Sequence, residues 1–276
     1  NALFLGTVVG FLASAVLVVS VILPSPSPTE PRGIYDRSTR GIRIYLATPR
    51  LRGLLALNFA AAAGGAMVLV NTVVLVRGEL GLPETALAWT MGAFGAGSMF
   101  AALVLPKLLD QVPDRPVMLT GAIILTSALL LLAALILGFG LSWPLLLAAW
   151  MAAGSGYSAV LTPSGRLLKR SAHPADRPAI FAAQFALSHA CWLVTYPLAG
   201  VLMTMAGAPV ALLSLALLSA FGIAVAVCLW PADDPEVISH RHDDLPADHS
   251  HLVEHGGGRV HAHAAVIDAL HRKWPG

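Results

Sequence analysis

Hydrophobic residues form seven long runs in this chain, and short polar segments separate them. The interior of each run contains no Lys, Arg, Asp or Glu. A run of about 20 such residues spans a bilayer as an α-helix, because a helix satisfies its own backbone hydrogen bonds where no water is present. The predicted transmembrane helices lie near residues 2–23, 54–76, 85–105, 117–139, 143–161, 179–203 and 208–230.

Composition supports the same class of protein. Hydrophobic residues make up 57% of the 276 residues and charged residues 12%, whereas soluble domains carry about 25% charged residues. The net charge is +2 and the basic residues form no patch for phosphate groups, so we expect no nucleic-acid partner. Cys191 and Cys228 lie in apolar runs, which indicates neither a disulfide nor a cysteine zinc site. We predict an all-α, polytopic membrane bundle of seven transmembrane helices, surrounded by membrane lipid.

The distribution of basic residues predicts the orientation of the chain. Every Lys and Arg except Arg77 lies in the first, third or fifth loop or after the last run. Because positively charged loops stay on the cytoplasmic side, we expect the first helix to begin outside and the C-terminus to be cytoplasmic, in the plasma membrane. The chain begins at Asn1 inside an apolar run, so we expect a fragment whose N-terminal six-helix half is missing.

The runs and loops divide the chain into four parts. Residues 1–23 are expected to form the transmembrane helix that closes the missing half, and residues 24–53 a cytoplasmic linker that is first proline-rich and then basic and interfacial. Residues 54–230 form the six-helix C-terminal half, and residues 231–276 a cytoplasmic, histidine-rich tail. The tail ends in a short amphipathic stretch, residues 265–274, which is expected to dock on the bundle or on the lipid surface.

An internal repeat relates the two parts of the six-helix half. Residues 54–69 align without gaps with residues 146–161, and eight of the sixteen positions are identical. Because the matched helices are three spans apart, the two sets of three helices have opposite topology. Inverted three-helix repeats are the building blocks of many secondary transporters.

Polar residues are distributed unevenly among the predicted helices. The third helix of each set, residues 117–139 and 208–230, contains nothing more polar than Ser and Thr, and we expect it to face lipid all round. Because polar groups are costly in hydrocarbon, those in the other helices face either a partner helix or a wet cavity. The larger polar and aromatic candidates are Asn58, Asn71, Tyr157, Gln184, Ser188, His189, Trp192 and Tyr196.

The loop between the second and third helices of the first set carries a family motif. In residues 106–115, Asp110 and Arg115 match the acidic and closing basic positions of the cytoplasmic loop signature of the major facilitator superfamily. The loop departs from the signature where Pro106 and Pro113 replace its two glycines and where Asp114 stands in place of a basic residue. With the helix pattern, the chain resembles the sixth to twelfth helices of a transporter of this superfamily. The resemblance implies that Asp110 and Arg115 belong to a conformational latch, and that the eight candidates line a central solute cavity.

Histidines are concentrated in the tail, where three His-x-His pairs occur: His240/His242, His249/His251 and His261/His263. In an extended chain the two imidazoles of a pair point to the same face, and together they can ligate a borderline metal ion such as zinc or nickel. We expect no other cofactor. The alternative is a flexible polar tail that binds metal only adventitiously.

The leading functional hypothesis is a secondary active transporter, not an enzyme, that moves a small solute outward by alternating access. We favour an organic or drug-like solute over an ion, because the membrane helices offer His189 and neutral amides but no carboxylate as ligands. The alternatives are a nickel, cobalt or zinc exporter that uses the tail, and a seven-helix sensor or receptor. An intramembrane hydrolase that pairs Ser155 with His189 is weaker, because close helix packing explains the small residues around Ser155.

Overall fold

The computed structural model describes residues 2–21, 34–235, 237–242, 245–246, 248–254, 258–268, 270–271 and 274. The chain divides into two units, Asn1–Arg32 and Gly33–Gly276. The first unit contains α1 (Ala2–Ser20), an apolar helix without a charged residue. The proline-rich start of the predicted linker, residues 24–31, lies outside the described residues, as does His255 of the tail.

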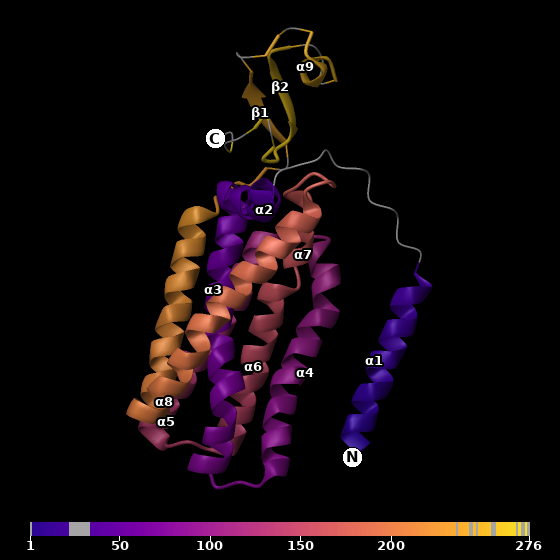
Figure 1. The fold of residues 1–276 in the computed structure, drawn as a ribbon. Coiled ribbons are helices and arrows are strands. Elements are labelled where there is room, and N and C mark those ends of the chain that lie inside the picture. Colours follow the sequence, from indigo (N-terminus) through magenta and orange to yellow (C-terminus); the bar gives the residue numbers. More distant parts are fainter. Residues whose placement is uncertain are drawn as a thin grey trace. The chain divides into compact units, whose positions relative to one another are not determined.

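Long apolar helices form the main body of the second unit (Figure 1). In chain order they are α3 (Pro49–Val73), continued by the π-helical turn η1 (Val74–Glu79), α4 (Glu84–Leu109), α5 (Asp114–Phe139), α6 (Trp143–Leu161), the short α7 (Ser164–Arg170) and α8 (Arg177–Leu229). Five helical segments of the described chain are long and apolar enough to cross a membrane. Several helices extend beyond the predicted runs, because polar residues at helix ends do not register in a hydropathy pattern.

α8 contains two of the predicted helices. Gly207 has φ 77° and ψ 178°, which interrupts the helical conformation, and the chain reverses its direction there (Figure 1). Glycine adopts a positive φ at little energetic cost, whereas any residue with a side chain would be strained in this backbone conformation. We call residues 177–206 the first arm of α8 and residues 208–229 the second arm. They correspond to the predicted runs 179–203 and 208–230.

Polar side chains of α3 bond to neighbouring helices. Asn71 is buried and donates its Nδ2–H to the carbonyl oxygen of Ala199, on the first arm of α8, at 3.1 Å. Trp150 of α6 donates its indole N–H to the hydroxyl oxygen of Thr72 at 2.7 Å. These bonds hold α3 in the interior of the bundle, where an unpaired polar group would destabilise it.

The third helices of the two predicted sets each have a buried face. Thr126 of α5 and Ser219 of the second arm of α8 are buried, and their hydroxyl oxygens are 2.7 Å apart. Leu125, beside this bond, packs against Gly64 of α3. The prediction that these helices face lipid all round is therefore wrong, because Ser and Thr, although weakly polar, bond across the helix contact.

α4 and α6 approach each other most closely at a pair of glycines. A Cβ atom at Gly97 would overlap a backbone carbonyl of α6, and one at Gly154 would overlap a backbone carbonyl of α4. The flanking serines bond across the same contact: Ser98 donates to the carbonyl oxygen of Gly154 at 3.0 Å, and Ser155 to that of Gly97 at 3.1 Å. Small residues let membrane helices pack backbone against backbone.

The predicted basic interfacial segment forms α2 (Ile34–Ala47), a helix that packs against α8. Arg40 binds both carboxylate oxygens of Asp176, at 2.6 and 2.9 Å, just before α8 begins. Tyr45 is fully buried and donates its hydroxyl to Oε1 of Gln184 at 2.5 Å. Burial, with a smaller contribution from Cys191, raises the pKa of Tyr45 above its usual value, so the phenol stays protonated and remains a donor.

The tail folds into a small hairpin at one end of the bundle, which we call the tail end. β1 (Val237–Arg241) and β2 (Val260–Ala264) pair in antiparallel register, with His240 opposite His261 and Ile238 opposite His263. The one-turn helix α9 (Ser250–Glu254) lies between them in the sequence. The His-x-His spacing therefore falls partly on paired strands, where alternate side chains share a face.

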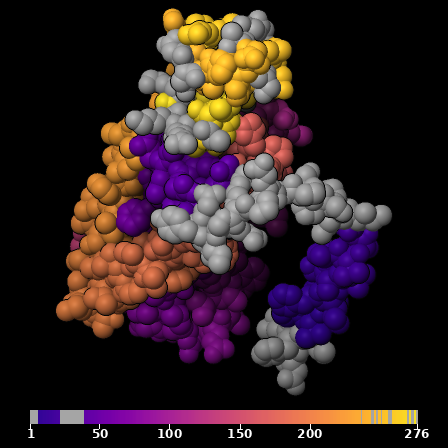
Figure 2. Space-filling model, turned by 45° about the horizontal axis from the view of Figure 1, so that its top comes forward, coloured from indigo at the N-terminus to yellow at the C-terminus, as the bar shows by residue number. Residues whose placement is uncertain are grey.

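The stretch after β2 docks on the bundle, as one of the two expectations for it stated. Its first residues, 265–267, are buried. Arg50, near the start of α3, donates Nη2–H to the carbonyl oxygen of Ala265 at 3.3 Å and lies 4.7 Å from the ring centroid of Trp274. Figure 2 shows the tail, in yellow, over the indigo residues of α2.

Candidate functional site

Four aromatic side chains from three helices form a continuous cluster. Phe94 of α4 lies 5.7 Å from Tyr157 of α6, measured between ring centroids. Tyr157 lies 6.3 Å from Trp192 on the first arm of α8, and Trp192 lies 4.7 Å from Tyr196 one turn further along. The rings meet in tilted or edge-on orientations, which aromatic quadrupoles favour. We call these four residues the aromatic surface.

The aromatic surface rests directly on α3. A Cβ atom at Gly65 would lie 2.6 Å from the Trp192 ring and 3.2 Å from the Tyr157 ring. Cβ atoms in proteins essentially never lie as close as 2.6 Å to another side chain. Only glycine at position 65 therefore allows the two rings to lie where they do. Side chains or backbone of α3, α4, α6 and α8 therefore meet at one place.

Part of the aromatic surface is accessible from outside the described bundle. Tyr196 is 39% exposed, and Tyr157 and Trp192 are half-buried. Among the described residues, neither the two tyrosine hydroxyls nor the Trp192 indole N–H has a hydrogen-bond partner. The surface thus offers ring faces together with polar groups that can bond to a ligand.

Three other predicted cavity residues, all amides, have hydrogen-bond partners outside the aromatic surface. Asn58 is buried and donates to the carbonyl oxygen of Leu54 in its own helix at 2.8 Å. Asn71 bonds to the first arm of α8 and Gln184 to Tyr45, as described above. These three amides already hold bonds within the protein, so the structure brings Tyr157, Trp192 and Tyr196 together without them.

His189 and Ser188 lie on the first arm of α8, one turn before the aromatic surface. Ser188 donates to the carbonyl oxygen of Phe185 at 3.0 Å, and His189 Nδ1 is 2.7 Å from the same oxygen. The His189 ring packs against the Phe185 ring in a tilted orientation, 3.9 Å between centroids, and His189 is exposed. The serine of the hydrolase alternative, Ser155, bonds instead to backbone carbonyls of α4 and α6. Within the described residues it has no bond to His189.

The predicted loop motif differs from the charge network that the structure contains. Asp110 ends α4 and is exposed, and Arg115 donates Nε–H to the carbonyl oxygen of Trp230 at 2.9 Å. The buried carboxylate of this loop belongs to Asp114, which pairs with Arg166 at 2.7 Å and with Arg170 at 3.5 Å. In the sequence, Asp114 is only a departure from the family motif.

The same network continues across the tail end of the bundle. Arg170 also binds Asp234 at 2.8 Å, and Asp234 lies 3.7 Å from Arg50 of α3. The indole N–H of Trp230 donates to the same Asp234 carboxylate at 3.1 Å. These partners come from the ends of α3, α7 and α8, so no local sequence motif signals them.

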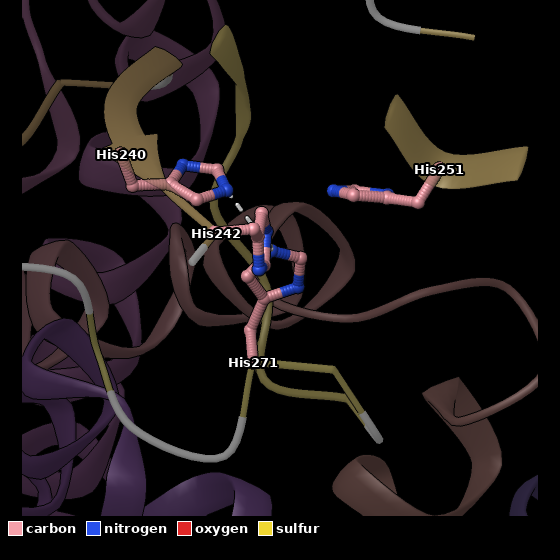
Figure 3. Close-up of side chains that lie close together, drawn as sticks. All are labelled: His240, His242, His251 and His271. Carbon is pink, nitrogen blue, oxygen red and sulfur yellow. Dashed lines mark hydrogen bonds between the residues drawn. The ribbon is translucent and has the colours of Figure 1, made fainter. Parts of the chain in front are cut away.

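Six tail histidines form a second candidate site, the histidine cluster: His240, His242, His251, His261, His263 and His271. Two overlapping groups of four have all their ligand nitrogens within 4.8 Å of one another, and Figure 3 shows one of them. Of the six predicted ligands, His249 lies outside both groups, and its Nδ1 accepts the amide N–H of His251. His271, which belongs to no His-x-His pair, takes part.

Burial and the neighbouring imidazoles favour the neutral form of two cluster histidines. Burial lowers the pKa of His240, despite a bond to the carbonyl of Ile238 that raises it. Burial and then the cluster neighbours lower the pKa of His251 to about 4. A neutral imidazole keeps a nitrogen lone pair, which is the form that binds metal.

The apolar helices and their helix-to-helix polar bonds define an integral membrane protein. Residues 54–263 match the family described as Major Facilitator Superfamily. The match covers most of the chain, so the protein belongs to the Major Facilitator Superfamily, a family of membrane transporters. No curated protein matches the sequence. Membership is consistent with the expectation that the protein is not an enzyme.

Proposed function

We propose that the protein is a secondary active transporter that moves a small organic or drug-like solute outward by alternating access. In this proposal α1 and the two arms of α8 count among seven membrane spans, and α3–α5 and α6–α8 are inverted three-helix repeats. Family membership and the match between residues 54–69 and 146–161 support it. We further propose that the chain works with a six-helix N-terminal half, and that its C-terminus is cytoplasmic in the plasma membrane.

The aromatic surface is the observation that carries the proposal. It combines residues of α4, α6 and α8 over Gly65 of α3, so a solute bound there would touch helices from both proposed repeats. In the family resemblance, the first helix of each set lines the central cavity. Here these helices are α3 and α6, which supply Gly65 and Tyr157.

The chemistry of the surface favours an organic solute. Aromatic rings with unpaired hydroxyl and indole donors bind apolar molecules that carry a few polar groups. His189 and Phe185, one turn away on the same arm, extend this face. A metal exporter is less well supported, because His189 is the only imidazole in the described membrane helices and carboxylates are absent from their interior.

The test is an efflux panel in cells that produce the full-length protein. Aromatic and cationic drug-like compounds are loaded, and their loss from the cells is followed with and without the protein. For a compound that is exported, we expect Trp192→Ala to abolish most of the protein-dependent efflux. Trp89→Ala is the matched control, because Trp89 lies on α4 outside the aromatic surface and is 70% exposed. Equal loss in both variants, or efflux that Trp192→Ala leaves unchanged, would count against the site.

A further inference from the structure

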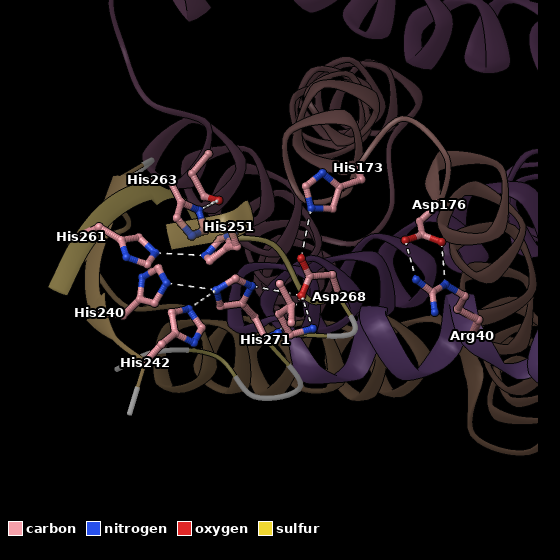
Figure 4. Close-up of polar contacts among 12 residues, drawn as sticks. Arg40, His173, Asp176, His240, His242, His251, His261, His263, Asp268 and His271 are labelled. Atoms are coloured by element: carbon pink, nitrogen blue, oxygen red, sulfur yellow. Dashed lines mark hydrogen bonds and ion pairs between the residues drawn. The ribbon is translucent and has the colours of Figure 1, made fainter. Parts of the chain in front are cut away.

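The histidine cluster draws its side chains from four segments that are separate in the sequence. His240 and His242 come from β1 and the residue after it, His251 from α9, His261 and His263 from β2, and His271 from the C-terminal stretch. Figure 4 shows their rings turned toward one another. Strand pairing explains part of this convergence, because His240 lies directly opposite His261.

The nitrogens that meet are mainly Nε2 atoms. Nε2 of His271 lies 3.0 Å from Nε2 of His240 and 3.1 Å from Nε2 of His242. Nε2 of His261 lies 3.0 Å from Nε2 of His251. Four ligands around zinc at about 2.1 Å place their nitrogens about 3.4 Å apart. Small side-chain rotations would therefore convert these contacts into a coordination shell.

Hydrogen bonds on the opposite ring nitrogens orient the lone pairs inward. Nδ1 of His240 lies 3.2 Å from the carbonyl oxygen of Ile238, and Nδ1 of His271 lies 3.0 Å from the carboxylate of Asp268. Both oxygens only accept, so each Nδ1 carries the proton and each neutral ring has its lone pair on Nε2. Two lone pairs that face each other at 3.0 Å repel unless a cation lies between them.

Asp268 adds a feature typical of metal sites. A ligating histidine usually gives its other N–H to a carboxylate or a carbonyl, which fixes the tautomer and raises the basicity of the ligand. Asp268 does this for His271, and its Oδ1 also accepts the backbone N–H of His271 at 2.6 Å. Backbone carbonyls have the same role for two other cluster histidines. Nδ1 of His261 lies 3.3 Å from the carbonyl oxygen of Gly258, and Nδ1 of His263 lies 2.9 Å from that of Ala264.

We infer that the histidine cluster is a binding site for one divalent transition-metal ion of the zinc, nickel and cobalt class, held by the imidazoles of His240, His242, His251 and His271. His240 and His251 also belong to the second group of four. Imidazole nitrogen is the donor that these borderline ions share, and the described cluster contains no thiolate that would select a softer ion. This inference does not depend on the identity of the transported solute.

The site has a contact that links it to the bundle. The second oxygen of Asp268 lies 3.3 Å from Nε2 of His173, in the loop between α7 and α8. Asp176, three residues further along this loop, holds Arg40 of α2 (Figure 4). His271 is therefore linked through Asp268 to the loop that leads into the arm carrying Trp192.

The test uses the full chain in lipid nanodiscs, purified through a tag that contains no histidine and freed of metal with a chelator. Cobalt is titrated while its visible d–d absorption is recorded, and zinc is titrated in competition with a chromogenic chelator. We expect one ion per chain and nitrogen coordination in the cobalt spectrum. The double variant His240→Ala/His251→Ala should weaken binding more than about 100-fold, beyond the effect of losing an outer-shell partner.

Two further variants separate a built site from an adventitious histidine tract. His249→Ala changes a histidine of the same tail outside the cluster and should leave the affinity unchanged. Asp268→Asn keeps all six imidazoles and should weaken binding about 10–100-fold. If His249→Ala weakens binding as much as the double variant, or if Asp268→Asn has no effect, the cluster is not the site that we infer. A wild-type chain that binds no cobalt or zinc would also overturn the inference.

Discussion

Gly65 decides how closely the aromatic surface lies on α3. The Trp192 and Tyr157 rings occupy the space that a side chain at this position would need. Asn71 and Thr72, six and seven residues further along α3, form hydrogen bonds with other helices and so hold α3 in place. At the scale of single residues, the site thus requires glycine at position 65 as well as the aromatic rings.

We expect Gly65→Ala to weaken solute binding. The added Cβ would lie 2.6 Å from the Trp192 ring, so the ring must shift, at a cost of about 1–3 kcal/mol for overpacking. The solute concentration for half-maximal transport should rise while the amount of protein in the membrane stays the same. Gly92→Ala is the control, because nothing lies within 4 Å of a Cβ there. Both changes favour the helix equally, so a loss confined to Gly65→Ala reports on the rings.

The connections between helices are fixed by charged residues at the tail end. Asp114 at the start of α5 accepts a hydrogen bond from Arg166 and forms an ion pair with Arg170, which also binds Asp234. The family motif assigns the latch to Asp110, which is exposed at the end of α4. The element that carries the buried charge is therefore the first turn of α5, where a carboxylate also stabilises the helix N-terminus.

Replacing Asp114 should destabilise the contact between α5 and α7. Asp114→Ala leaves two arginines without their buried carboxylate, and we expect a loss of about 1–3 kcal/mol, less than for a fully buried pair because Arg166 is partly exposed. Thermal unfolding in detergent would show this loss, and Asp110→Ala should leave the transition where it is. If Asp110→Ala instead lowers the unfolding temperature more than Asp114→Ala does, the latch lies at Asp110, as the family motif implies.

At the scale of the whole molecule, the apolar runs predicted where the helices lie. The pattern even separated the two arms of α8, because Gly207 and Pro209 stand between two hydrophobic runs. The sequence could not show which face of α5 is buried, because Ser and Thr are compatible with both lipid and helix contacts. It also did not predict the hairpin, since the tail is polar and lacks apolar periodicity.

The candidate sites were predicted less completely than the helices, for a physical reason. Tyr157, Trp192 and Tyr196 were among the predicted cavity residues, yet Phe94 and Gly65 were not, because apolar residues carry no signal in an apolar helix. Asp114 and His271 gain their partners only through contacts between distant segments. Sequence spacing predicts which residues have suitable chemistry, whereas their grouping depends on tertiary packing.

The central claim is that the aromatic surface faces a solute path filled with water, and cysteine labelling tests this most directly. Cys191 and Cys228 are changed to Ser, and Tyr196→Cys and Phe221→Cys are introduced separately into this background in sealed membrane vesicles. Phe221, on the second arm of α8, is 62% exposed and Tyr196 only 39%, so exposure alone favours labelling at position 221. We predict that a membrane-impermeant maleimide modifies Tyr196→Cys and leaves Phe221→Cys unmodified, because one faces water and the other lipid. Modification of Phe221→Cys alone, or of neither, would contradict the account.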